Sequence, residues 1–90
     1  MYNVYIIKNS RNELYIGVTD NLKHRLRDHN TGKGAAFTKN KANFIYVFIE
    51  ECNTLKEARK REIQIKKWRR DKKEMLIKKY NLRQETKIKK

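Results

Sequence analysis

Two runs near the amino terminus alternate between apolar and polar residues, as half-buried β-strands do. The first covers Tyr2–Lys8 and the second covers Glu13–Thr19, and both are rich in β-branched and aromatic residues. The segment between them, Asn9–Asn12, is rich in residues that favour turns, so the two runs predict a β-hairpin. Because side chains alternate along a strand, the second run has two faces: Leu14, Ile16 and Val18 on one, Tyr15 and Gly17 on the other.

A helical pattern follows the hairpin. Either Asp20 or Thr19 is placed to cap a helix over Asn21–Asn30. The next segment, Thr31–Lys41, is rich in glycine and lysine and predicts a flexible basic loop. Phe44–Ile49 is a continuous apolar run, which predicts a third strand with both faces covered or nearly so.

Two capping-box patterns start the remaining helices. Thr54–Glu57 opens a helix that reaches about Trp68, and Asp71–Glu74 opens a shorter helix that ends near Tyr80. We therefore expect an α+β fold of order β-β-α-β-α-α, in which three helices flank a small, three-stranded, mainly antiparallel sheet. Residues 1–82 would form one domain, and residues 83–90 a basic, flexible tail.

Polar residues interrupt the apolar stripe of the first helix. Leu22 and Leu26 define that stripe, and Arg25 and His29 fall on it at the same helical spacing. A buried cation costs several kcal/mol unless it is paired. We therefore expect an anionic group, from the protein or from a ligand, to meet Arg25.

The second helix shows the same anomaly with the opposite charge. Glu62 lies near the centre of an inward stripe defined by Leu55, Ala58 and Ile65. A carboxylate there requires a cation, which is either Arg25, a metal ion, or both. A plain internal salt bridge between Arg25 and Glu62 is the structural alternative, because inward ion pairs also occur without function.

Tyr5, Tyr15 and Gly17 each allow a structural and a functional interpretation. Tyrosine is common in strands for packing alone. Glycine in a strand marks either a bulge or a place where a ligand approaches the backbone closely. Taken singly, each residue favours the structural interpretation, but together with Arg25, His29 and Glu62 they are consistent with one pocket. We expect the side chains of five residues to converge on one face of the sheet: Tyr5, Tyr15, Arg25, His29 and Glu62.

Net charge narrows the possible partners. The chain has 24 Lys and Arg against 10 Asp and Glu, a formal net charge of +14. This favours a nucleic-acid backbone over an anionic membrane surface, because no helix pairs a basic face with a strong Trp, Phe and Leu face. No apolar run is long enough to cross a bilayer, and the chain starts with a strand pattern rather than a signal peptide.

Cysteine and histidine are scarce. One Cys and two His exclude a structural zinc cluster, and Cys52 alone cannot form an internal disulfide. A half-buried free thiol fits a reducing compartment, so we expect a cytoplasmic protein. We also expect a monomer without a membrane partner.

Together these elements resemble the GIY-YIG nucleases, which cut DNA with one divalent metal ion. The family's first motif reads here as Val4-Tyr5-Ile6, with its leading glycine replaced, and the second is intact as Tyr15-Ile16-Gly17. Arg25 followed four residues later by His29 matches the family's helical pair, and Glu62 matches its metal-binding glutamate. The resemblance covers about residues 1–81.

The resemblance also indicates a subgroup. Arg61–Trp68, with Phe37 and Thr38 before it, is similar to small bacterial members related to the N-terminal nuclease domain of the excinuclease ABC system. Those domains carry a lysine directly after the second motif, where this chain has Val18. Many members also use a late asparagine, for which Asn81 is the candidate.

The resemblance assigns a role to each residue of the pocket. Glu62 would bind Mg²⁺ or Mn²⁺, and Arg25 would donate to a non-bridging phosphate oxygen. Either Tyr5 or Tyr15 would accept the proton of the attacking water, while His29 would support that tyrosine or bind phosphate. Because Val18 replaces the lysine that would assist Tyr15, Tyr5 ranks first as the general base.

The resemblance therefore implies a metal-dependent DNA endonuclease that acts in DNA repair, recombination or single-stranded DNA processing. Residues that contact DNA without taking part in catalysis would be Gly17, Lys33, Lys39, Lys41, Lys66, Lys67, Arg69 and Arg70. The alternative is a catalytically silent DNA- or RNA-binding module on the same fold. A basic adaptor for an acidic protein is a third class, but it leaves the inward Arg25 and Glu62 unexplained.

Overall fold

The computed structural model describes residues 1–31 and 43–83. It contains the expected order of elements, β-β-α-β-α-α. Three of the expected DNA contacts, Lys33, Lys39 and Lys41, lie outside the described residues, as does the proposed tail from residue 84 onward. Most of the predicted basic loop, residues 32–41, also lies outside them.

The sheet has three antiparallel strands, as predicted. Strand β1 (Tyr2–Lys8) lies in the centre, between β2 (Leu14–Thr19) and β3 (Ile45–Cys52). Both neighbours pair with β1 in antiparallel register. The central strand therefore contains four consecutive residues without exposed surface, Val4, Tyr5, Ile6 and Ile7.

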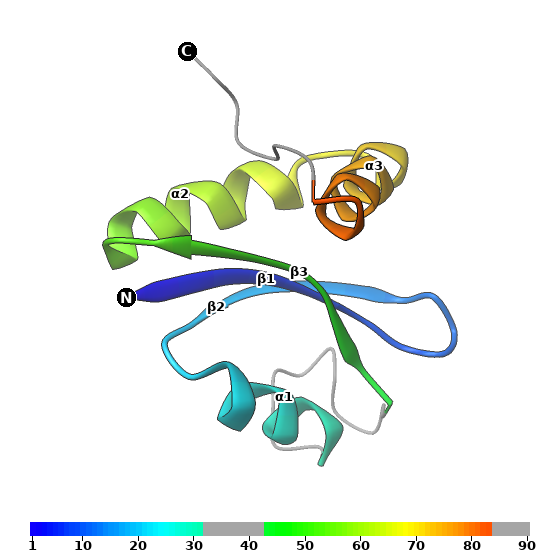
Figure 1. Ribbon diagram of the computed structural model, residues 1–90, viewed down its shortest axis with the longest axis horizontal. Helices are drawn as coiled ribbons and strands as arrows, with labels where there is room; N and C mark the ends of the chain where they lie inside the picture. The colour runs from blue at the N-terminus through cyan, green and yellow to red at the C-terminus, as the bar shows by residue number, and fades with distance from the viewer. Residues whose placement is uncertain (32–42, 84–90) are drawn as a thin grey trace.

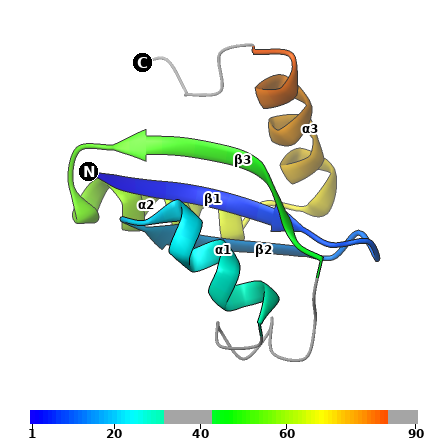
Figure 2. The same cartoon turned by 60° about the horizontal axis from the view of Figure 1, so that its bottom comes forward.

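Helices cover both faces of the sheet. Helix α1 (Leu22–Asn30) lies against one face, and α2 (Leu55–Lys66) and α3 (Arg70–Asn81) lie against the other (Figure 1). Turning the molecule brings α1 in front of β1 and β2 (Figure 2). The sheet is thus the middle of three layers, and a side chain on either face can be enclosed.

Each face has its own apolar cluster. The cluster under α2 and α3 contains Ile6, Ile16, Phe48 and Ile65 with their neighbours. The smaller cluster under α1 is aromatic: it contains Tyr5, Ile7 and Phe44, with Tyr15, Leu22, Leu26 and Tyr46 packed against it. The strand alternation predicted for β2 is confirmed, since Leu14, Ile16 and Val18 pack in the first cluster and Tyr15 in the second.

The third strand differs from its prediction. It begins at Ile45, one residue later than expected, and continues to Cys52. Ile45 is 62% exposed, so the expectation that both faces are covered is wrong at this end. The pairing with β1 shifts between Ile6 and Ile7, which inserts Val47 as an extra residue in β3.

Two helix starts also differ from their predictions. Asn21, and neither Asp20 nor Thr19, caps α1, and its side chain accepts a hydrogen bond from the backbone N–H of His24. Helix α3 starts at Arg70, so Asp71 lies in the first turn and does not cap it. Asparagine reaches the N3 amide as well as aspartate does, which makes such starts hard to rank from sequence.

Helix α2 starts as predicted but packs differently at its first turn. Thr54 caps the helix through the N–H of Glu57, and the helix ends at Lys66 with Lys67 as its C-cap, before the expected Trp68. Ala58 and Ile65 face the sheet, whereas Leu55 is 42% exposed and does not belong to the inward stripe. Glu62 is only 6% exposed, as its position on the stripe predicts.

Candidate active site

Two tyrosines share one face of the sheet under α1. Tyr5 of β1 lies opposite Gly17 of β2, and Ile7 lies opposite Tyr15, so the two tyrosines are diagonal neighbours. Their ring centroids are 6.4 Å apart. A Cβ atom at Gly17 would lie 2.5 Å from the Tyr5 hydroxyl oxygen. The absence of a side chain at position 17 therefore makes room for the Tyr5 ring across the neighbouring strand.

Helix α1 brings Arg25 and His29 to the same tyrosine. Leu22 and Leu26 pack on the sheet, which turns the interleaved polar residues inward as the helical spacing predicts. His29 Nε2 lies 2.8 Å from the Tyr5 hydroxyl, and Arg25 Nε donates to that oxygen at 3.3 Å. The structure thus brings Tyr5, Tyr15, Arg25 and His29 into one cluster.

The end of α1 is fastened to the sheet. The side chain of Asn30 donates to the carbonyl oxygen of Phe44 at 3.1 Å and accepts from its N–H at 2.7 Å. At the other end of the helix, the hydroxyl of Tyr46 donates to the carbonyl oxygen of Leu22. These contacts at both ends hold the helix in place against β3 and fix the positions of Arg25 and His29 between them.

Burial determines the protonation states of Tyr5 and His29. Desolvation raises the pKa of Tyr5 to about 12 despite the hydrogen bond from Arg25, which lowers it. Desolvation, followed by the charge of Arg25, lowers the pKa of His29 to about 4. Both groups are therefore neutral near pH 7. With Arg25 donating to the oxygen, the Tyr5 proton is available for donation to His29 Nε2.

The two tyrosines differ in their access to solvent. Tyr5 and His29 have no exposed surface, while Tyr15 and Arg25 are only half-buried. Arg25 also hydrogen bonds with Tyr15, which contributes to the raised pKa of its guanidinium after the larger contribution of Tyr5. A water molecule can therefore reach Tyr15 directly, but reaches the Tyr5 hydroxyl only if its neighbours move. The sequence analysis ranked Tyr5 before Tyr15 as the general base, whereas solvent access in the structure favours Tyr15.

Tyr46 is a member of the cluster that was not predicted from sequence. Its ring meets that of Tyr5 edge-on, with centroids 5.5 Å apart. Burial raises its pKa to about 12, so it is a neutral hydrogen-bond donor to α1. The signal was the alternation of Phe44 and Tyr46, which was interpreted from sequence only as part of an apolar run.

Glu62 approaches from the other layer of the molecule. It lies on α2, so the expectation that all five site residues come from one face of the sheet is wrong. Its carboxylate pairs with Arg59 at 3.0 Å and with Lys66 at 3.2 Å. Among the described residues there is no direct Arg25–Glu62 ion pair, which removes the structural alternative. The charge of Glu62 nevertheless contributes to the raised pKa of Tyr5.

The chemistry of Glu62 fits a hard divalent cation whose remaining ligands come from water and substrate. Mg²⁺ is commonly held by one or two carboxylates plus phosphate oxygens. The carboxylate is nearly buried, while its partners Arg59 and Lys66 have side chains 57% and 50% exposed and can move aside. In the described part of the chain, no group of three or more His, Cys, Asp or Glu residues is placed to hold a metal. Glu62 would be the single protein ligand.

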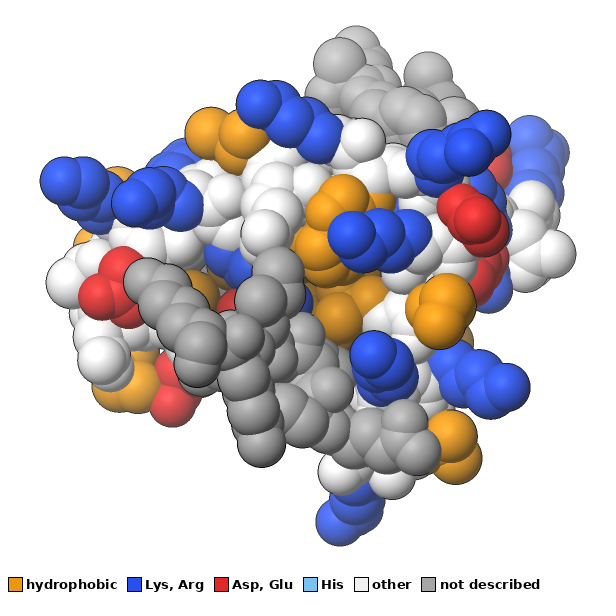
Figure 3. Space-filling view, turned by 90° about the horizontal axis from the view of Figure 1, so that it is seen from above, with side chains coloured by type: hydrophobic (Ala, Val, Ile, Leu, Met, Phe, Trp, Pro, Cys, Tyr) orange, Lys and Arg blue, Asp and Glu red, His pale blue; other side chains and the backbone are white. Residues whose placement is uncertain are grey.

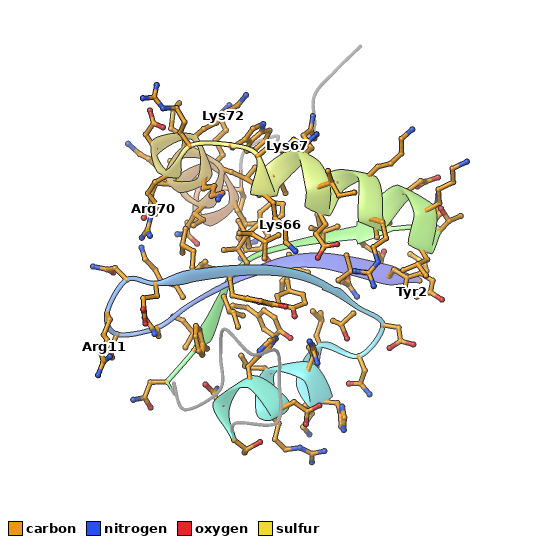
Figure 4. The ribbon with its side chains drawn as sticks, turned by 180° about the vertical axis from the view of Figure 1, so that it is seen from behind. Tyr2, Arg11, Lys66, Lys67, Arg70 and Lys72 are labelled. Atoms are coloured by element: carbon orange, nitrogen blue, oxygen red, sulfur yellow. The ribbon has the colours of Figure 1, made fainter. Side chains whose placement is uncertain are left out.

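The expected DNA contacts that the structure describes at the end of α2 and the start of α3 are on the surface. Lys66, Lys67, Arg69 and Arg70 are all exposed. Figure 4 shows Lys66, Lys67 and Arg70 on the side of the molecule where β2 is the nearest strand. From the side of α2 and α3, Lys and Arg side chains are spread widely over the surface (Figure 3). The described surface on this side is therefore basic.

The domain belongs to a class of nucleases, as its match to a family model shows. Residues 1–81 match the family model of the GIY-YIG catalytic domain. The chain belongs to the GIY-YIG family, a superfamily of nucleases that act on nucleic acid and typically use divalent metals.

Related bacterial proteins are similar over most of their length. A UPF0213 protein from Syntrophus aciditrophicus is 45% identical over 76 residues, covering 83% of this chain and 87% of the relative. UPF0213 protein SH2523 from Staphylococcus haemolyticus is 40% identical over 74 residues, covering 82% and 90%. The solution NMR structure of UPF0213 protein BH0048 from Bacillus halodurans has a TM-score of 0.56 and 32% identity, covering 87% of this chain and 84% of that one. These names state no activity, so the site itself is the basis for a proposed reaction.

Proposed function

We propose that this protein is a metal-dependent DNA endonuclease that hydrolyses phosphodiester bonds with one Mg²⁺ or Mn²⁺ ion. The observation that carries the proposal is the Tyr5 hydroxyl held between Arg25 and His29, beside the half-buried Tyr15. Such a cluster offers a proton acceptor and a fixed cation close to each other. Both are required to add water to a phosphodiester.

Arg25 is the group that would meet the phosphate. It is half-buried, is held by the tyrosines, and has a planar guanidinium that can donate to two oxygens at once. Its positive charge would offset the negative charge that develops on the non-bridging oxygens as water adds to phosphorus. Its bonds to the tyrosines orient it before the substrate arrives.

Tyr15 is the tyrosine we assign to the attacking water. It retains exposed surface and lies beside Arg25, with which it hydrogen bonds. With its own phenol proton first released to solvent, Tyr15 would take the proton of the water as the new bond to phosphorus forms and the bond to the leaving 3′-oxygen breaks. His29 lies under this tyrosine, with ring centroids 4.9 Å apart, and limits the positions the ring can adopt.

Tyr5 is then a positioning residue. Its hydroxyl proton is directed at His29 Nε2 and its oxygen accepts from Arg25, so it fixes the two groups relative to each other. A pKa of about 12 keeps the phenol neutral and suited to this role. This assignment replaces the sequence ranking, in which Tyr5 was the general base.

Glu62 would hold the metal ion, together with water and phosphate oxygens. When bound, the ion would supply positive charge to the leaving 3′-oxygen. The contribution of the protein is a carboxylate that is nearly buried on α2.

A plasmid relaxation assay tests the proposal. Supercoiled plasmid should be nicked by the wild-type protein with Mg²⁺ or Mn²⁺, and left intact when EDTA is present. Gel shifts in EDTA should still show binding, because the basic surface does not depend on the metal. Binding without nicking under any metal would support the alternative, a catalytically silent nucleic-acid-binding module. Duplex, branched and single-stranded oligonucleotides should be compared in the same assay, since these classes correspond to repair, recombination and single-strand processing.

A further inference from the structure

We propose that the tip of the β1–β2 hairpin is a second nucleic-acid contact, at which Arg11 binds a backbone phosphate beyond the candidate active site. This inference rests on the proposed function and extends it. It requires that the substrate continue past the pocket in the direction of the hairpin. The protein would then discriminate against ends and very short fragments.

The hairpin turn is a built structure. The side-chain oxygen of the buried Asn9 accepts from the N–H of Arg11 at 3.1 Å and from the N–H of Glu13 at 2.9 Å. Its amide group donates to the Glu13 carboxylate at 2.7 Å. Asn12 adopts φ of 63° and donates its N–H to the carbonyl oxygen of Asn9 at 3.0 Å. The turn therefore holds the backbone of Arg11 in one conformation.

Helix α3 stabilises this turn through side-chain contacts. Arg70 Nη2 donates to the carbonyl oxygen of Asn12 at 2.6 Å, while its Nε donates to Glu74 at 2.8 Å. Lys8, at the end of β1, pairs with the same Glu74 carboxylate at 3.4 Å. Helix α3 thus contacts both the turn and the end of β1, although a simple connection between two strands needs no such support. Because folding already orders the hairpin tip, binding a ligand there does not incur the entropic cost of ordering it.

Arg11 itself is left available. Its side chain is exposed, and the contact that it makes within the turn uses the backbone N–H. By contrast, Arg59, Arg61 and Arg70 all have their guanidinium groups engaged by carboxylates. Among the residues that the structure describes, no carboxylate pairs with the Arg11 guanidinium. Such a group on a fixed turn is suited to a phosphate, because it donates in a planar fork.

The position of the tip fits one substrate running past the pocket. Figure 4, in which β2 is the nearest strand, shows Arg11 and Arg70 near the hairpin end of the molecule. Lys66 and Lys67 lie further along in the same view. At a rise of about 3.3 Å per strand residue, the tip lies about 15 Å along β2 from Gly17. That is the length of about four or five steps of a duplex. Lys66 and Lys67, at the end of α2, add positive charge on this side.

Fluorescence anisotropy in EDTA tests the proposal without requiring cleavage. Labelled duplexes of about 8 and about 24 base pairs would be compared, since only the longer can cover pocket and tip in every binding register. Arg11→Gln should weaken binding to the long duplex about three- to tenfold and reduce the salt slope by about one, with a much smaller effect on the short duplex. Arg27→Gln is the matched control: Arg27 is exposed on α1, away from the hairpin.

Equal affinity of Arg11→Gln and wild type for the long duplex would overturn the proposal, as would the same loss at both lengths. Polyglutamate serves as a competitor of protein-like chemistry. If it displaced the duplex from the wild type but not from Arg11→Gln, the tip would be a site for acidic protein, and the proposal would be wrong. Thermal unfolding of each variant checks that the hairpin is intact. Because no metal is present, failure of the nuclease proposal would leave this result unaffected.

Discussion

The hydroxyl of Tyr5 occupies the space that a side chain at position 17 would fill. A Cβ atom built on Gly17 would meet the Tyr5 hydroxyl oxygen at 2.5 Å and the ring carbon that carries it at 2.7 Å. The glycine of the second motif is thus explained by a residue of the first. Whether Gly17 also contacts DNA, as expected from the sequence, remains a separate prediction.

Gly17→Ala should therefore damage both stability and activity. Overpacking of a buried site costs about 1–3 kcal/mol, and the displaced Tyr5 would lose its contacts with His29 and Arg25. Urea unfolding measures the first effect and nicking rate the second. In the double variant Gly17→Ala/Tyr5→Phe, removal of the hydroxyl should recover part of the stability. Strictly additive losses in the two single variants would contradict the contact.

The two tyrosines should separate in kinetics and stability. Tyr15→Phe should reduce single-turnover cleavage by about two orders of magnitude with little change in stability, because it removes the proton acceptor and keeps the ring. Tyr5→Phe should lower stability by about 1–3 kcal/mol, because it removes the buried hydrogen bond between the Tyr5 hydroxyl and His29 Nε2. Normal cleavage by Tyr15→Phe, combined with an inactive but stable Tyr5→Phe, would restore the ranking predicted from sequence.

Alternation and helical spacing were sufficient to predict much of the cluster. Tyr15 and Gly17 could be placed on one face because side chains alternate along a strand. Arg25 and His29 could be placed facing the sheet because they share a helical stripe with leucines. These rules act within one element or one hairpin. They therefore survive without knowledge of the tertiary arrangement.

The predictions that were wrong or missing depend on how helices and strands are placed relative to one another. Glu62 was correctly predicted to be buried, but sequence periodicity does not say which face of the sheet its helix covers. The greater burial of Tyr5 follows from its place on the central strand under α1, which became known only with the strand order. Tyr46 was missed because its bond to Leu22 joins residues separated by 24 positions.

Acid should destabilise the protein through His29. Burial and the charge of Arg25 lower the pKa of this residue from 6.5 to about 4. Between these values the unfolded chain binds a proton that the folded chain does not, so the free energy of unfolding falls as pH falls from about 6.5 to 4, by up to about 3 kcal/mol. Urea unfolding of His29→Gln across this range should show a flatter dependence than wild type. His24→Gln, which changes an exposed histidine, should not.

Arg25→Lys should show that catalysis requires the planar guanidinium of Arg25 and not only its positive charge. Lysine keeps the positive charge but cannot hold Tyr5 and donate to two phosphate oxygens at once. We expect cleavage to fall at least about tenfold while DNA binding in EDTA changes little. Arg27→Lys provides the matched control on the exposed side of the same helix. If Arg25→Lys cleaved at the wild-type rate, a simple electrostatic role would replace the proposed one.

Nicking of supercoiled plasmid by Glu62→Gln tests the central claim most directly. The substitution keeps the size of the side chain and removes the charge that would hold the metal. It also frees Arg59 and Lys66 from their ion pairs. We predict loss of Mg²⁺-dependent nicking with DNA binding unchanged or slightly stronger, whereas Glu57→Gln, an exposed position in the first turn of α2, should nick normally. Wild-type nicking by Glu62→Gln would contradict the one-metal nuclease.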